Sequence, residues 1–226
     1  VNDPANWIDV FGSRDVHMFL SLNARTSDAM ERVTAQLRDE WRSATTEVFC
    51  RDGYLPSDHR AHFGFVDGIS QPRVAGVPAQ RSDTAASPEF ADPMPLVPPG
   101  AFVLGFESGH TGHHYPAPAP DVLGRNGSFA AFRILEQDCA AFEEFLEESS
   151  ATTGLDRELI AAKLIGRWRS GQPLSLAPDA STLADVPLHN WNQFDHADDP
   201  RGVRCPMGSH IRRTNPRRAD VAGGDR

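Results

Sequence analysis

The sequence has 226 residues, of which 39% are hydrophobic and 23% charged, a composition typical of a globular protein that can bury a core. Its formal net charge of −9 argues against general binding to nucleic acid or to an anionic membrane surface, because both need a basic face. No apolar run approaches the roughly 20 residues of a membrane-spanning helix. The segment starting at Val1 lacks the features of a signal peptide, so a secreted and a cytoplasmic location both stay open, as does the oligomeric state.

The first fifty residues predict two strands and one helix. Apolar residues alternate over residues 15–22, which predicts a half-buried strand. Ser27 or Asp28 is expected to cap a helix that runs to about Arg42 with an apolar stripe along one face. A second strand is expected over residues 46–50.

The middle of the chain is rich in proline, glycine, alanine and serine. Residues 73–120 are therefore expected to form loop or extended chain rather than helix, with a possible short strand over residues 101–106. The turn pair Asn126-Gly127 then precedes a predicted strand over residues 128–135. Any domain boundary is expected in this proline-rich middle.

The last third predicts two helices followed by irregular chain. Asp138 is expected to open a helix with Cys139 on its buried apolar face, and residues 156–168 predict a second helix. Residues 173–204 are expected to be irregular. Because a strand followed by a helix occurs twice, the pattern indicates an α+β fold with antiparallel sheets.

One carboxylate lies between glycines in the segment His62-Phe-Gly-Phe-Val-Asp67-Gly-Ile-Ser-Gln-Pro72. Glycines allow the backbone to approach a flat ligand closely, and an aspartate presented beside such a ligand can act as a general base. An Asp-Gly pair by itself is more often a simple turn.

A single histidine is followed by arginines in Cys205-Pro-Met-Gly-Ser-His210-Ile-Arg-Arg-Thr-Asn-Pro-Arg217. A neutral imidazole is a common ligand of haem iron, and nearby arginines can hold the haem propionates. A lone histidine is nevertheless more often an ordinary surface or core residue.

Together these segments resemble the dye-decolourising peroxidase family. Gly64-x-x-Asp67-Gly68 matches the family's GxxDG signature, and residues 210–217 are similar to its proximal-histidine segment. Weaker similarities lie at residues 99–105 and 162–169. The resemblance extends over most of the chain, in the order and spacing of the family's longer-chain branch.

The resemblance implies two ferredoxin-like α+β domains with antiparallel sheets, of the dimeric α+β barrel type and incomplete at both ends. Residues 1–95 would be the remainder of the N-terminal domain and would contain the GxxDG segment. Residues 96–226 would be part of the C-terminal, haem-binding domain.

The resemblance also implies a haem b site. His210 would be the iron ligand and Asp67 the distal acid–base group. Contacts with the cofactor are expected from Gly68, Ile69, Gln71, Arg212 and Arg217, the two arginines as propionate partners. The family's distal arginine and the acidic partner of its proximal histidine are expected beyond the end of this sequence.

The activity implied is that of a haem peroxidase that uses hydrogen peroxide to oxidise dyes and phenolic or other aromatic donors in one-electron steps. The alternative is a module that binds or handles haem or iron without peroxidase turnover. A third possibility is a fragment that binds nothing by itself.

Overall fold

The chain divides into two compact units, Val1–Tyr54 and Leu55–Arg226. The computed structural model describes residues 3–53, 56, 58–70, 73–77, 96–109 and 114–214. The expected domain boundary between residues 95 and 96 adjoins residues 78–95, which lie outside the described residues, and it stays a prediction.

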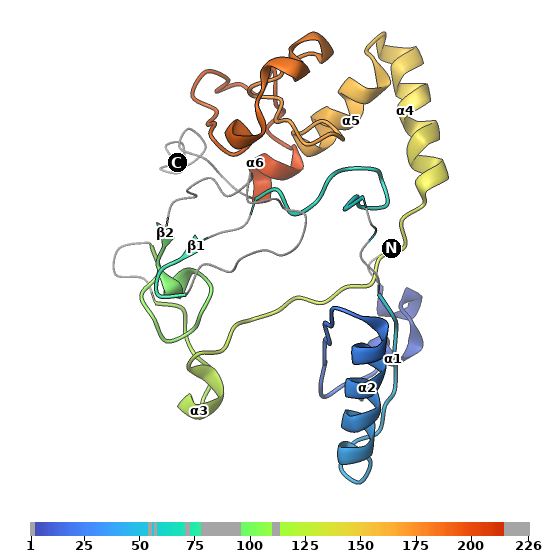
Figure 1. The fold of residues 1–226 in the computed structure, drawn as a ribbon, viewed down its shortest axis with the longest axis vertical. Helices are drawn as coiled ribbons and strands as arrows, with labels where there is room; N and C mark the ends of the chain where they lie inside the picture. Colours follow the sequence, from blue (N-terminus) through green and yellow to red (C-terminus); the bar gives the residue numbers. More distant parts are fainter. Residues whose placement is uncertain are drawn as a thin grey trace. The chain divides into compact units, whose positions relative to one another are not determined.

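The described residues of the first unit form one long helix and two short ones (Figure 1). They are the 3-10 helix η1 (Pro4–Asn6) and the α-helices α1 (Asp9–Gly12) and α2 (Ser27–Trp41). The hydroxyl of Thr26 accepts a hydrogen bond from the backbone N–H of Ala29 at 3.2 Å, so the cap lies one residue before the expected Ser27. The end of α2 agrees with the prediction, but none of the described residues of this unit is buried.

The two strands predicted in the first unit are absent. Residues 15–22 and 46–50 form no ladder, and Met18 and Phe19 are 64% and 62% exposed. A strand requires a hydrogen-bonded neighbour, and none of the described residues pairs with these segments. The prediction of a half-buried strand over residues 15–22 was therefore wrong.

The second unit contains most of the regular structure. Among its described residues, the elements are β1 (Arg73–Val74), β2 (Leu96–Val97), the 3-10 helices η3 (Pro99–Ala101), η4 (Ala180–Asp185) and η5 (Leu188–Asn190), and the α-helices α3 (Asp121–Gly124), α4 (Cys139–Thr153), α5 (Arg157–Ile165) and α6 (His210–Thr214). No helix among the described residues is both long enough and apolar enough to cross a membrane.

The sheet content of the described residues differs from the prediction of antiparallel sheets. β1 pairs with β2 in parallel over two residues, with Arg73 opposite Leu96. Antiparallel pairing occurs as two isolated bridges, Arg60 with Val66 and Arg167 with Pro173. The ferredoxin-like sheet therefore stays a proposal.

Two further predicted strands are also absent. Residues 128–135 are extended but unpaired, and Phe129 and Leu135 are 71% and 75% exposed. Residues 101–106 form turns, because Pro99 begins a 3-10 helix. Gly100 also packs closely there: an added Cβ would lie 2.2 Å from the carbonyl oxygen of Glu107.

Helices α4 and α5 lie side by side (Figure 1) and begin where the sequence predicts. Asp138 accepts a hydrogen bond from Ala141, and Asp156 caps α5 through Glu158 and Leu159. Each cap satisfies backbone N–H groups that have no partner within the helix. The end of α5, at Ile165, comes three residues before the expected one.

Glycine conformation explains the early end of α5. Gly166 adopts φ of +92°, which other residues avoid, and an added Cβ would lie 2.4 Å from the side chain of Ile211. Cys139 is exposed, contrary to the prediction that it belongs to the core. The buried face of α4 is formed farther along the helix, by Leu146.

Two hydrophobic clusters share α5. Ala161 packs with Leu146 and Phe65, whereas Ala162 packs with Trp168, Leu174, Ala177 and Cys205. Successive helical residues point about 100° apart, so α5 buries two faces. The segment containing Phe65 and the segment containing Cys205 are therefore attached to different faces of one helix.

Candidate functional site

The segment Gly64-x-x-Asp67-Gly68 folds as a tight loop. Ala61 donates to the carbonyl of Phe65 and Gly64 donates to the carbonyl of Ala61, both at 2.8 Å. Gly64 and Gly68 have φ of +86° and +76°, a conformation that favours glycine. The two glycines of the motif are therefore required by backbone geometry.

This loop exposes the carboxylate of Asp67. The backbone N–H of Asp67 donates to the carbonyl of His59 at 3.0 Å, and its Oδ1 accepts from the N–H of Gly68 at 2.7 Å. None of the described residues is bonded to Oδ2. One carboxylate oxygen is thus held while the other can accept a proton.

Arg169 holds the loop from the side that precedes Asp67. Its carbonyl accepts from the N–H of Val66 at 3.1 Å and from the guanidinium of Arg60 at 2.8 Å. Its own guanidinium lies 5.8 Å from the ring centre of Phe65 and bonds Glu143 of α4 at 2.6 Å. The loop is therefore tied to α4 and to the chain after α5.

Asn192 holds the loop from the side that follows Asp67. Ile69 is 6% exposed, and its backbone carbonyl accepts from Nδ2 of Asn192 at 2.6 Å. Oδ1 of Asn192 accepts from the guanidinium of Arg167 at 2.9 Å. Ile69 is therefore buried and anchored.

His210 is the first residue of α6 and is exposed. The residue before it, Ser209, is buried, and its Oγ lies 3.2 Å from Sγ of the buried Cys205. No described residue bonds the imidazole of His210. Its ring is therefore accessible while the adjacent backbone is packed.

The side chain of Arg212 is buried, which differs from the setting expected of a propionate partner. Its Nη1 donates to the carbonyls of Cys205 and Asp199 at 2.8 and 3.1 Å and lies 3.6 Å from the carboxylate of Asp199. These contacts fasten α6 to the chain before it. The propionate role of Arg212 stays a prediction. Gln71 and Arg217 lie outside the described residues.

Asp199 orders the chain that leads to His210. Its carboxylate accepts backbone hydrogen bonds from Val203, Arg204 and Cys205 at 2.7, 3.2 and 2.9 Å. Burial acts to raise the pKa of Asp199. The three N–H donors and the charge of Arg212 outweigh burial, so its pKa is lowered.

We expect Asp199→Asn to lower the free energy of unfolding at pH 7 by about 1–3 kcal/mol, because the amide accepts these bonds less well than the carboxylate. Since the pKa of folded Asp199 is lowered, its stabilisation is complete above the ordinary aspartate pKa of 3.8 and is lost as pH falls through the folded pKa. The difference between variant and wild type should therefore shrink below pH 3.8.

Urea unfolding at a series of pH values measures this difference. The matched control is Asp198→Asn, because the neighbouring Asp198 is exposed and accepts from Arg204 through its backbone carbonyl. Equal stability of Asp199→Asn and wild type at pH 7 would contradict the prediction.

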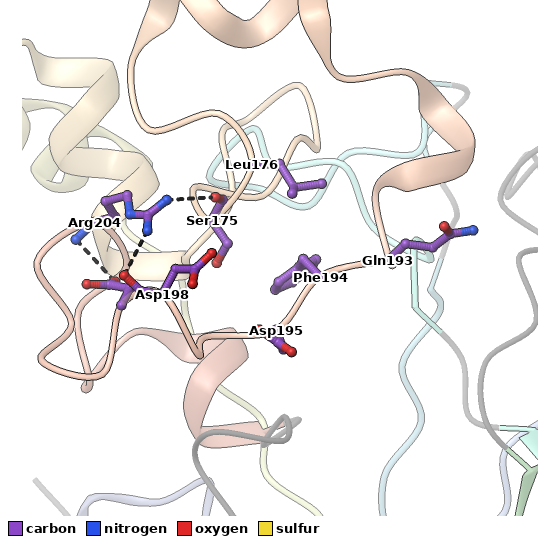
Figure 2. Close-up of a pocket in the computed structure, with 8 residues that line it drawn as sticks. Ser175, Leu176, Gln193, Phe194, Asp195, Asp198 and Arg204 are labelled. Carbon is purple, nitrogen blue, oxygen red and sulfur yellow. Dashed lines mark hydrogen bonds between the residues drawn. The ribbon is translucent and has the colours of Figure 1, made fainter.

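A cavity of about 410 Å³ is lined in part by the segment that contains Asp199 (Figure 2). Arg204 lines it and donates to the backbone carbonyls of Ser175 and Asp198 at 3.5 and 2.8 Å. The lining residues are Ser175, Leu176, Gln193, Phe194, Asp195, Asp198, Asp199 and Arg204. None of the site residues expected from the sequence lines this cavity, and we assign it no role.

The chain between Gly166 and Gly171 contacts both motif segments. A Cβ on Gly166 would meet Ile211 at 2.4 Å, and a Cβ on Gly171 would meet Ile69 at 2.9 Å. The segments of His210 and Asp67 are thus attached to opposite ends of one short turn. No described group of three or more histidine, cysteine or acidic side chains is arranged to hold a metal ion.

Sequence reasoning missed the residues that support the site. Arg167 and Arg169 lie in a segment noted only for weak similarity, and no motif contains Asn192 or Asp199. A buried polar side chain is recognised by its partners, and these partners are distant in sequence.

Sequence comparison finds relatives along nearly the whole chain. The chain is 33% identical over 228 residues to Peroxidase 2 of Mycetinis scorodonius. This alignment covers 96% of the chain and 42% of Peroxidase 2. The chain is 32% identical over 235 residues to the dye-decolorizing peroxidase msp1 of the same organism, covering 99% of this chain and 43% of the relative.

A more limited match is the multifunctional dye peroxidase DyP2 of Amycolatopsis sp., 35% identical over 162 residues, which are 69% of this chain and 31% of the relative. A solved dye-decolorizing peroxidase in complex with 2,6-dimethoxyphenol matches with a TM-score of 0.64 at 30% identity, covering 86% of this chain and 44% of the other. No family model matches. The chain spans less than half the length of these relatives.

Proposed function

We propose that this chain, which spans about 42% of its relative Peroxidase 2, belongs to the dye-decolorizing peroxidase family and forms the part of a haem peroxidase that provides the iron ligand and the distal carboxylate. The observation that supports this most is the arrangement around α5. Both motif segments pack against this helix and the turn after it, while Asp67 and His210 expose their side chains.

The residues present fit a haem in their donor chemistry. His210 offers an exposed imidazole, the usual protein ligand of haem iron in peroxidases. Gly68 has no side chain to obstruct a flat ring beside Asp67, and the buried side chain of Ile69 fixes the backbone next to it. We propose that His210 holds the iron and that Gly68, Ile69 and Gln71 contact the cofactor.

The arginines would have different roles. Arg217 remains our proposed propionate partner. Arg212 would contribute chiefly by fixing α6, because its guanidinium already binds the carbonyls of Cys205 and Asp199.

A bound haem would supply the reduction of hydrogen peroxide and the one-electron oxidation of aromatic donors. Asp67 would accept the proton of one peroxide oxygen at its Oδ2 and return it to the other oxygen, which leaves as water. The hydrogen bond from Gly68 to Oδ1 keeps the carboxylate oriented during both transfers. Ser209 and Cys205, both buried, keep the backbone before His210 in place.

The substrates proposed are hydrogen peroxide with dyes and phenolic or other aromatic donors, in line with the names of the relatives. Each relative reported above is named a peroxidase, and none supports the alternative of a haem-handling module.

Titration of the purified chain with hemin tests this proposal. We expect a Soret band that saturates at one haem per chain, and peroxide-dependent bleaching of an anthraquinone dye by the loaded chain. Free hemin at the same concentration is the control for bleaching. A Soret band that stays identical to that of free hemin would contradict the proposal.

A further inference from the structure

Arg167 and Asn192 form a buried polar pair beside the loop of Asp67. Both residues are 7% exposed. Arg167 donates from Nη2 to Oδ1 of Asn192 at 2.9 Å and from Nη1 to the carbonyls of Gly171 and Trp191 at 3.0 and 2.8 Å. The guanidinium is thus held at several points and can orient its neighbour.

Arg167 determines which way the amide of Asn192 faces. A guanidinium only donates hydrogen bonds, so the oxygen of the amide must face Arg167 and its nitrogen must face away. That nitrogen lies 2.6 Å from the carbonyl oxygen of Ile69. The pair therefore anchors the backbone two residues after Asp67.

Packing fixes Ile69 at the same place. Gly171 has φ of +114°, and an added Cβ there would lie 2.2 Å from the ring of Trp191 and 2.9 Å from Cδ1 of Ile69. On the other side, the N–H of Val66 is held by the carbonyl of Arg169. The backbone of Asp67 thus lies between two anchors, of which Asn192 provides the second.

We propose that Asn192, oriented by Arg167, is a positioning residue for the carboxylate of Asp67. It acts through the backbone of Ile69 and makes no contact with substrate. The proposal rests on the proposed function, in which Asp67 moves the proton of peroxide. Proton transfer requires the carboxylate within hydrogen-bond reach of its substrate, and a displacement of about 1 Å costs as much as about 100-fold in rate.

The test is Asn192→Asp, which keeps a partner for Arg167 but replaces the donor to Ile69 with an oxygen that repels its carbonyl. The matched control is Gln193→Glu, the same chemical change at the next residue, which is exposed. Hydrogen–deuterium exchange of the chain without haem is measured over residues 60–70 and, for reference, over α4. The reaction of the haem-loaded chains with peroxide is followed by stopped flow.

We expect Asn192→Asp to raise exchange over residues 60–70 with exchange in α4 unchanged, and to slow the reaction with peroxide about 10-fold at unchanged haem content. Gln193→Glu should change neither. If Asn192→Asp does not fold, Asn192→Ser removes the donor to Ile69 without a new charge, although it also removes the acceptor for Arg167.

Unchanged exchange over residues 60–70 would overturn the proposal, and so would raised exchange with a normal rate of reaction with peroxide. A normal rate for Asp67→Asn would instead overturn the role of Asp67 itself. The positioning role of Asn192 would then be overturned as well, whatever hydrogen–deuterium exchange the Asn192→Asp variant shows.

Discussion

Replacing His210 with alanine is expected to lower the affinity of the chain for haem by at least about 100-fold. Loss of an outer-shell partner of a metal ligand already costs about 10–100-fold in affinity, and this change removes the ligand. His210 is exposed at the start of α6, so its loss should leave the packing of Cys205 and Ser209 intact. Titration with hemin, followed at the Soret band, measures the affinity.

The matched control for this experiment is His189→Ala. His189 is also an exposed histidine of the second unit, at a 3-10 helix that contains no motif residue. We expect it to bind haem as wild type does. The thermal unfolding temperature of both variants without haem should match that of wild type. Undiminished haem binding by His210→Ala would show that another residue is the ligand.

Replacing Asp67 with asparagine is expected to slow the reaction with hydrogen peroxide by about 10²–10⁴-fold, the usual contribution of a general acid–base group. The amide has nearly the same shape, so it can still accept from the N–H of Gly68, but it cannot take up a proton. Haem content and unfolding temperature should not change. Stopped-flow measurement at equal haem occupancy gives the rate.

Asp185→Asn is the matched control for the aspartate. Asp185 is exposed at the end of η4. Its substitution replaces a carboxylate with an amide in the same way, but at a position outside both motif segments. It should react with peroxide at the wild-type rate. A loss of haem from Asp67→Asn would mean that Asp67 supports binding rather than proton transfer.

The helices of this protein are predictable because their signals are local. Thr26, Asp138 and Asp156 each cap a helix through N–H groups two or three residues away. The end of α5 was less predictable, since it depends on the contact between Gly166 and Ile211 as well as on glycine conformation. The prediction therefore placed it three residues too far along.

The strand predictions were wrong because a strand, unlike a helix cap, depends on residues elsewhere in the chain. Alternation of apolar residues over residues 15–22 and 128–135 indicates which side chains could share a face, but a strand forms only against a partner. None of the described residues provides one, and both segments expose their large apolar side chains. The periodicity of these segments therefore predicted that the chain is extended, but it could not predict whether a neighbouring strand pairs with it.

The motifs identify chemistry by residue type and order, and this much follows from the sequence: a carboxylate between glycines, a histidine before arginines, and the family that contains both. The support of the site depends on folding. Asn192 meets Ile69 across 123 positions of the chain, and Arg212 meets Asp199 across 13. Such partners come together because α5 buries two faces, Ala161 towards the Asp67 loop and Ala162 towards the segment before His210. Burial then makes each polar group require its partner, since an unpaired polar group costs free energy once water is excluded.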